Sequence, residues 1–346
     1  MTLLEIYDNI LRTPDRWMYY SRMNIPSTEC DVHFLFESDD HARHFIEQYF
    51  AAGNKLDVFR MPYIGMDNRW RHTLSVFILG IALSDLLGID ISAEDDQHHN
   101  KCHLYQWFLT CLYHDYGYTI ENTPGTYNPN ELSIHRLFRM LGGTHYLSLR
   151  PDDSEFSNSV RWRYYDYCRN HRGFINHGII GGLMLYDQLV SHLLLELKNH
   201  GKVNEYTDVA SGLHYSWTQK NDFALCADAI IAHNIWFDVS PIGELRLSRG
   251  EKHTYKKWLT ALLVLCDTIE PLKTFPCCSP ISILGHINLG IDHANNSISI
   301  AGTNPSCTYS AYIEKCGSLQ KWTYIKKRET SANSIILSDL RKSYSI

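Results

Sequence analysis

The sequence predicts a mostly α-helical protein with a small α+β region at its C-terminus. Three observations support this fold class. Between about residues 40 and 272, apolar residues recur at helical spacing in long segments. Polar stretches rich in Gly, Pro, Asn and Asp separate those segments. After Pro271 the pattern changes to alternating apolar residues, which is typical of strands.

The helical spacing predicts helices over the following segments: 40–52, 70–88, 101–116, 131–141, 173–199, 219–236 and 252–270. Beyond Pro271, alternation predicts a β-hairpin with strands 281–292 and 297–302, then a short helix at 310–321 and strands at 322–329 and 334–340. We therefore divide the chain into a helical N-terminal extension (1–64), a main helical domain (65–272) and a small α+β C-terminal region (273–346).

Composition excludes several classes of protein. Of the 346 residues, 44% are hydrophobic and 12% are aromatic, which excludes a disordered chain. The net charge of −6 argues against an extended nucleic-acid surface, although a basic cluster can still bind a small anion. The N-terminus lacks a signal-type apolar core, and no apolar run is long enough for a membrane span, so the sequence predicts a cytoplasmic protein that does not contact the membrane.

The 10 cysteines are scattered, and several lie in apolar helical segments. This distribution favours buried free thiols in a reducing compartment. A disulfide scaffold is the alternative interpretation.

His114 and Asp115 end the apolar helical segment HLYQWFLTCLYHDYGY. A charged aspartate at the end of such a helix is costly unless it is paired or binds a metal. The adjacent pair offers one imidazole nitrogen and two carboxylate oxygens at almost the same point, and a carboxylate can bridge two cations. The pair is therefore a candidate centre of a metal site.

Four other segments each place one candidate ligand in an apolar helix. These residues are His72, His177, His233 and Asp267. A single histidine in an apolar helix is more often a hydrogen-bonded core residue, but ligand-type residues on five separate helices favour a common site. Beside His177, the glycines Gly178, Gly181 and Gly182 predict a close approach of the main chain to a neighbouring segment.

The order His72, His114-Asp115, His177, His233, Asp267 resembles the HD superfamily of metal-dependent phosphohydrolases, in the version that holds two metal ions. The resemblance covers about residues 65–275. It implies an HD-type helical domain in which His72, His114, Asp115 and Asp267 match the ligands shared across the superfamily. His177 and His233 match the extra histidines of the second metal site, and Asp115 matches the bridging carboxylate and the catalytic residue.

Imidazole and carboxylate ligands suit two divalent transition-metal ions (Mn, Fe, Co, Ni or Zn). The resemblance implies hydrolysis of a phosphoester or phosphoanhydride, with a small phosphorylated or nucleotide substrate, by metal-activated hydroxide. Two alternatives stay open. One is an HD-type diiron oxygenase, which uses the same ligand set, and the other is a non-catalytic nucleotide-binding sensor.

Candidate substrate contacts surround the predicted ligands. Tyr118 takes the place of a lysine that follows the HD pair in one branch of the superfamily. The segment 161–172 contains Arg163 and Arg172 among aromatic residues, which fits either a phosphate clamp or an amphipathic helix with a solvated basic face. Asn176 and Asn234 flank predicted ligands and either bind substrate or a metal-bound water, or cap their helices.

Overall fold

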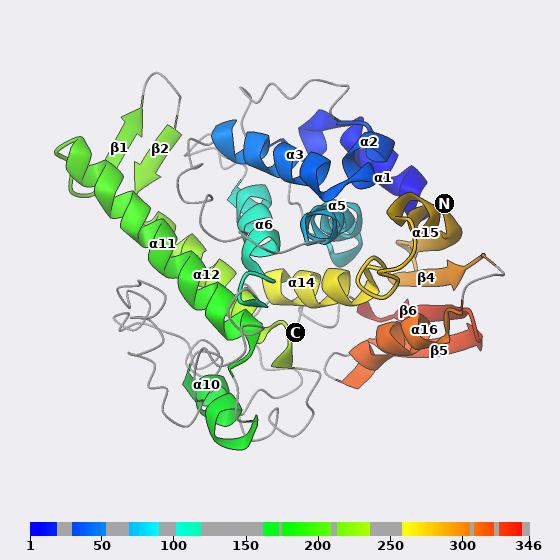
Figure 1. The fold of residues 1–346 in the computed structure, drawn as a ribbon. Helices are drawn as coiled ribbons and strands as arrows, with labels where there is room; N and C mark the ends of the chain where they lie inside the picture. Colours follow the sequence, from blue (N-terminus) through cyan, green and yellow to red (C-terminus); the bar gives the residue numbers. More distant parts are fainter. Residues whose placement is uncertain are drawn as a thin grey trace.

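A computed structural model describes residues 1–18, 30–52, 69–89, 102–118, 162–172, 175–208, 213–235, 258–304, 308–321 and 325–340. These residues form a mostly helical protein with a small sheet near the C-terminus (Figure 1), as the sequence predicted at this coarse level. The predicted helix at 131–141 lies outside the described residues.

Helix α5 (Trp70–Leu87) lies at the centre of the described helices (Figure 1). Its residues are apolar on nearly all sides, as expected for a helix that is buried all round. It packs against α6 (Cys102–Tyr113), which is followed directly by His114 and Asp115, and against α14 (Trp258–Ile269), which carries Asp267. The Trp107 indole of α6 donates a hydrogen bond of 2.9 Å to the main-chain carbonyl of Phe77 in α5. Glycine at position 80 makes room for this indole, because a Cβ there would lie 2.0 Å from the Trp107 ring.

The antiparallel helices α11 (His177–Asn199) and α12 (Gln219–Ala232) pack along each other on one side of α6. The predicted close approach at the glycines of α11 is confirmed. A Cβ at Gly178 would lie 2.6 Å from the carbonyl oxygen of Ile230 in α12. A Cβ at Gly181 would lie 2.5 Å from the carbonyl oxygen of Tyr113 in α6. Gly117, just after α6, is equally crowded, with the His177 carbonyl 2.0 Å from its would-be Cβ.

A short hairpin, β1 (Glu205–Asp208) and β2 (Leu213–Ser216), connects α11 to α12. The sequence predicted a loop over 201–208, and this prediction was wrong for the strand residues. The reason is physical: β1 is largely exposed and polar, so it shows no alternation of apolar and polar residues that would reveal a strand.

The N-terminal extension contributes three described α-helices: α1 (Leu3–Leu11), α2 (Val32–Glu37) and α3 (Asp39–Ala52). A capping box starts α1, because Thr2 accepts a hydrogen bond from the Glu5 amide and the Glu5 carboxylate accepts one from the Thr2 amide. Helices α1 and α3 both pack on α5. The N-terminal residues also pair with the C-terminal region, since the Leu289 amide donates to the Met1 carbonyl at 2.9 Å.

The C-terminal region contains a four-stranded antiparallel sheet in the order β3-β4-β6-β5. Its strands are β3 (Ile287–Asp292), β4 (Ser297–Gly302), β5 (Lys326–Ser331) and β6 (Ser334–Ser338). The predicted hairpin is confirmed for 287–302, but residues 281–286 belong to a helix, α15 (Pro280–His286). Pro280 occupies the first turn of α15, where its fixed φ favours a helix, and this signal outweighs the short alternation that suggested a strand.

Helix α16 (Ser310–Gly317) connects β4 to β5, packs on β6 and reaches the end of α14. The Tyr312 hydroxyl donates a hydrogen bond of 2.5 Å to the Ile269 carbonyl. The Lys315 ammonium donates one of 3.2 Å to the main-chain carbonyl of Asp267. The C-terminal region thus supports the helix end that carries one of the predicted ligands.

Two described helices, α5 and α11, are long and apolar enough to cross a membrane by length and composition. In the most apolar stretch of each helix, 89% of the residues of α5 and 72% of those of α11 are buried inside the protein. Core helices of folded proteins share this burial, so length and composition do not identify a membrane span here.

Candidate metal centre

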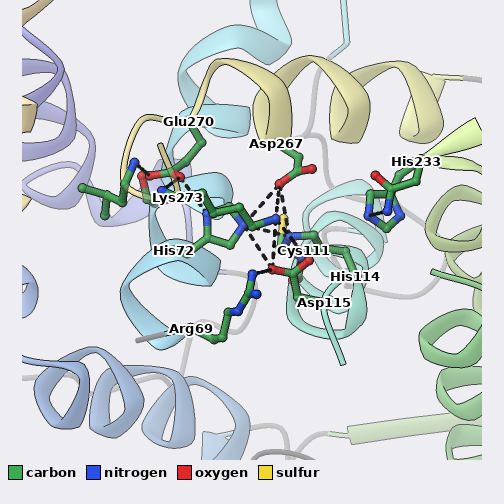
Figure 2. A network of polar contacts seen from close by, with 12 residues as sticks. Arg69, His72, Cys111, His114, Asp115, His233, Asp267, Glu270 and Lys273 are labelled. Carbon is green, nitrogen blue, oxygen red and sulfur yellow. Dashed lines mark hydrogen bonds and ion pairs between the residues drawn. The ribbon is translucent and has the colours of Figure 1, made fainter. Parts of the chain in front are cut away.

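The structure brings together all the predicted metal ligands from five parts of the fold. Figure 2 shows five of them: His72, His114, Asp115, His233 and Asp267. They come from the start of α5, the turn after α6, the first residue of α11, the residue that ends α12, and α14. Each of these side chains is buried. In the order of the elements just named, the residues are His72, His114 with Asp115, His177, His233 and Asp267.

The first group of donor atoms belongs to His72, His114, Asp115 and Asp267, which point towards one another in Figure 2. The Nε2 atoms of His72 and His114 are 3.0 Å apart, and His72 Nε2 is 3.2 Å from Asp267 Oδ1. Asp115 oxygens lie 3.5 Å from each of the two Nε2 atoms. Two ligand atoms that are each about 2.1 Å from one ion lie about 3.0–3.4 Å apart at octahedral or tetrahedral angles. The observed separations are close to those of donors around a single cation.

The second group consists of Asp115, His177 and His233, whose donor atoms all lie within 4.8 Å of one another. His177 Nε2 is 3.7 Å from Asp115 Oδ1. The amide nitrogen of Asn234 lies 2.7 Å from His177 Nε2 and 2.9 Å from His233 Nε2. Asp115 belongs to both groups, so its carboxylate lies between two neighbouring sets of donors.

Hydrogen bonds at Nδ1 leave the Nε2 atoms of two histidines available as ligands. His114 Nδ1 and His233 Nδ1 each lie 2.5 Å from a main-chain carbonyl, of Cys111 and Ile230 respectively. A carbonyl only accepts, so the proton is on Nδ1 and a neutral ring presents a lone pair at Nε2. Burial, and next the neighbouring His177, lower the pKa of His233 to about 3, which keeps this ring neutral. The two Nε2 atoms therefore suit a cation.

The Glu270 carboxylate contacts the Nδ1 atom of His72 and so orients this ring. This fully buried carboxylate accepts a hydrogen bond of 2.7 Å from His72 Nδ1 and others from the main-chain amides of Leu272 and Lys273. Burial and Lys273 lower the pKa of His72, but Glu270 and Asp267 outweigh them and raise it. A carboxylate behind a histidine ligand fixes the ring and strengthens its basicity.

We expect Glu270→Leu to weaken metal binding by about 10- to 100-fold, since it removes the group that orients His72. Glu270→Gln is the matched comparison, because its side-chain oxygen can still accept the Nδ1 proton. Calorimetric titration of metal-stripped protein with Mn²⁺ measures both affinities. Equal affinities for the Leu and Gln variants would show that Glu270 does not orient a ligand.

Two cationic side chains contact the carboxylates of the cluster. Asp115 Oδ2 lies 2.9 Å from Arg69 Nη1 and 3.0 Å from Lys273 Nζ, and Lys273 Nζ lies 2.8 Å from Asp267 Oδ1. Burial raises the pKa of Asp115, but His114, Lys273 and His72 outweigh it and hold this pKa well below its usual value. Burial raises the pKa of Asp267, but Lys273 and the neighbouring His114 and His72 outweigh it and hold this pKa well below its usual value. Both carboxylates are therefore anionic at neutral pH.

A cavity of about 290 Å³ lies against the cluster. Its polar walls come from Arg69, Arg71, His72 and Lys273, and its apolar walls include Leu272, Phe275 and Pro280. Arg71 is held by Asp39, which accepts from the Arg71 amide at 2.9 Å and lies 3.5 Å from its guanidinium. The cavity offers positive charge beside a candidate ligand, as a small anionic molecule requires.

The predicted substrate contacts lie in different surroundings. The Tyr118 ring stacks on His177 with centroids 3.6 Å apart, and the Arg69 guanidinium lies 4.3 Å from its centroid. Burial, and next the charge of Asp115, raise the pKa of Tyr118 to about 12. Asn176 caps α11 by accepting from the Gly178 amide at 2.9 Å, which is the capping alternative, while Asn234 lies between the two histidines of the second group.

The segment 162–172 forms α10 (Tyr164–Tyr167) and a π-helical turn, Cys168–Arg172. Its side chains Tyr164, Tyr165 and Cys168 are buried, whereas Arg163 is exposed and Arg172 is half-buried. Its role as a phosphate clamp stays a prediction for Arg163 and Arg172, and Arg161 lies outside the described residues. The cations that contact the described carboxylates of the cluster are Arg69 and Lys273.

Sequence reasoning missed Arg69, Glu270 and Lys273. A signal exists for two of them: Arg69 precedes His72 by three residues and Glu270 follows Asp267 by three, a spacing that places side chains on one helical face. Lys273 follows Pro271, beyond the helix, and its position depends on the turn that Glu270 stabilises.

Comparison with protein-family models, with curated proteins and with solved structures finds no match to this chain. The functional argument therefore depends on the chemistry of the buried cluster and the cavity beside it.

Proposed function

We propose that this chain is an HD-type metal-dependent phosphohydrolase that holds two divalent transition-metal ions. The observation that carries the proposal is that two groups of buried His and Asp donors share Asp115 at separations suited to coordination. The Nε2 atoms of His72 and His114 lie 3.0 Å apart, a separation that two ligands of one cation would have.

The residues present fit such ions. Imidazole nitrogens and carboxylate oxygens form a donor set for Mn, Fe, Co, Ni or Zn. Two such ions, when bound, supply a water nucleophile at neutral pH and neutralise charge on the phosphoryl oxygens. His72, His114, Asp115 and Asp267 would hold one ion, and His177 and His233 with Asp115 would hold the other.

The remaining polar residues have roles that follow from their contacts. Arg69 Nη1 and Lys273 Nζ form ion pairs of 2.9 and 3.0 Å with the Asp115 carboxylate, and Arg69, which contacts Asp115 and not Asp267, would orient this carboxylate between the two donor groups. The same two cations line the cavity, so they are placed to attract a phosphate group to the cluster. The apolar wall at Phe275 limits water around that phosphate.

The test is metal analysis of the purified protein, followed by assays with phosphoesters, nucleotides and phosphoanhydrides in the presence of Mn²⁺ or Fe²⁺. We expect about two metal ions per chain and metal-dependent release of phosphate. Oxygen consumption by the iron-loaded protein, without phosphate release, would instead identify the diiron oxygenase. Nucleotide binding without any turnover would identify the sensor.

A further inference from the structure

Lys273 lies where it can act on both the candidate metal centre and the cavity. It belongs to the turn that follows α14, and its ammonium is 2.8 Å from Asp267 Oδ1 and 3.0 Å from Asp115 Oδ2 (Figure 2). These two oxygen atoms belong to the donor set described above. The ammonium thus neutralises the same carboxylates that a metal ion would neutralise.

A metal ion and the Lys273 ammonium compete for these carboxylates. Ligand oxygens lie about 2.0–2.2 Å from a transition-metal ion. An ammonium within 3.0 Å of the same oxygens would then be next to a divalent cation, in a site where Asp115 is fully buried. Repulsion between charges at such short range is strong where water is excluded. Lys273 contacts both carboxylates of the donor set, whereas the ion pair of Arg69 is with Asp115, so binding of the ion favours the departure of Lys273 from this position.

The cavity provides the place to which Lys273 can move. Lys273 already lines it, and its side chain is 21% exposed, so the flexible stem can turn without crossing the core. There the ammonium would join Arg69 and Arg71, which line the same cavity. Arg69 and Arg71 are paired with Asp115 and Asp39, so the ammonium would add positive charge to the cavity of about 290 Å³, as binding of a phosphate group requires.

We propose that Lys273 serves two sites in turn: it is the counter-cation of Asp115 and Asp267 without metal, and a ligand for an anionic substrate group in the cavity with metal bound. The proposal rests on the proposed metal centre and deepens it, because it names the substrate class. A substrate with two neighbouring phosphates, one at the metals and one in the basic cavity, fits better than a simple monoester. Metal binding and anion binding are then coupled through one side chain.

The experiment compares wild type with Lys273→Met, which keeps an unbranched apolar stem and removes the charge. Calorimetry of metal-stripped protein with Mn²⁺ should show binding about tenfold tighter or more in the variant, because the competing cation is gone. Calorimetry of the Mn²⁺-saturated protein with methylene bisphosphonate, a pyrophosphate analogue whose P–C–P link is not hydrolysed, should show binding about tenfold weaker or more. Lys273→Gln repeats both measurements if the Met variant does not fold.

Lys315→Met is the matched control. Lys315 is also a lysine beside Asp267, but its ammonium contacts the main-chain carbonyl of that residue at 3.2 Å and not the carboxylate. We expect its Mn²⁺ affinity to stay within about twofold of wild type. Equal tightening in the Lys315 and Lys273 variants, or no tightening in either, would overturn the role of Lys273.

These measurements do not depend on turnover, so the two proposals can fail separately. If the protein hydrolyses no phosphoester but Lys273→Met shows the expected opposite changes in Mn²⁺ and methylene bisphosphonate affinity, the phosphohydrolase function is wrong and the role of Lys273 stands. A protein that hydrolyses phosphoesters with unchanged affinities in Lys273→Met would keep the function and lose this role.

Discussion

Asp115→Asn is expected to release both metal ions and to lower phosphohydrolase activity about a thousandfold or more. Asp115 belongs to both groups of donors, and asparagine keeps the shape of the side chain but lacks the negative charge that two cations share. Elemental analysis gives the metal content, and a phosphate-release assay with the best substrate gives the activity. Among the residues that the structure describes, Asp115 is the ligand that the two donor groups share.

Asp222→Asn is the control for this experiment. Asp222 is a carboxylate on α12 that accepts a hydrogen bond of 2.8 Å from Gln106, and it does not belong to the donor groups. This variant should keep its metal and its activity. If Asp115→Asn kept full metal content and activity, Asp115 would not be the bridging ligand, and the proposed two-metal arrangement would be wrong.

His177→Ala or His233→Ala is expected to reduce the metal content from about two ions to about one per chain. Each change removes a donor of the second group only, and leaves His72, His114, Asp115 and Asp267 to hold the first ion. Activity should fall by orders of magnitude, since one ion cannot stabilise both the attacking and the leaving oxygen. Metal analysis and turnover are measured on the same preparation.

His200→Ala provides the comparison for this pair. His200 ends α11, the helix that begins with His177, and its exposed ring lies 3.8 Å from Glu196. Metal content and activity should be unchanged. The second metal site would be wrong if the wild-type protein bound only one ion per chain when saturated with Mn²⁺, Fe²⁺ or Zn²⁺. This outcome would hold irrespective of the metal content of the variants.

The helices that carry the cluster were predictable because a buried helix must be apolar, and a histidine or aspartate in an apolar segment stands out. His72, His114, Asp115 and Asp267 were found in this way. In the structure, a donor atom of each lies within 3.6 Å of a donor atom of another member of this set. The sequence could not show the distances, because these depend on how the helices pack.

Other features had weaker signals. Glu270 follows Asp267 at helical spacing, but one acidic residue before a proline is also an ordinary helix end. Lys273 contacts Asp115, which lies 158 positions earlier in the chain, and no local pattern encodes such a contact. The β1 strand and α15 were missed because short segments carry few residues with which to separate strand from helix.

The glycines around the cluster have a consequence for how this centre could change. At Gly117 and Gly181, main chain meets main chain with no space for a methyl group, and Gly178 brings α11 equally close to α12. The positions of Asp115, His177 and His233 relative to one another are therefore set by the contact of backbones. A substitution of one of these three side chains would change the donor atoms, while the spacing of the elements that carry them would stay the same. The donor atoms of the candidate centre and the spacing of the elements that carry them are thus determined by separate residues, and each can vary without the other.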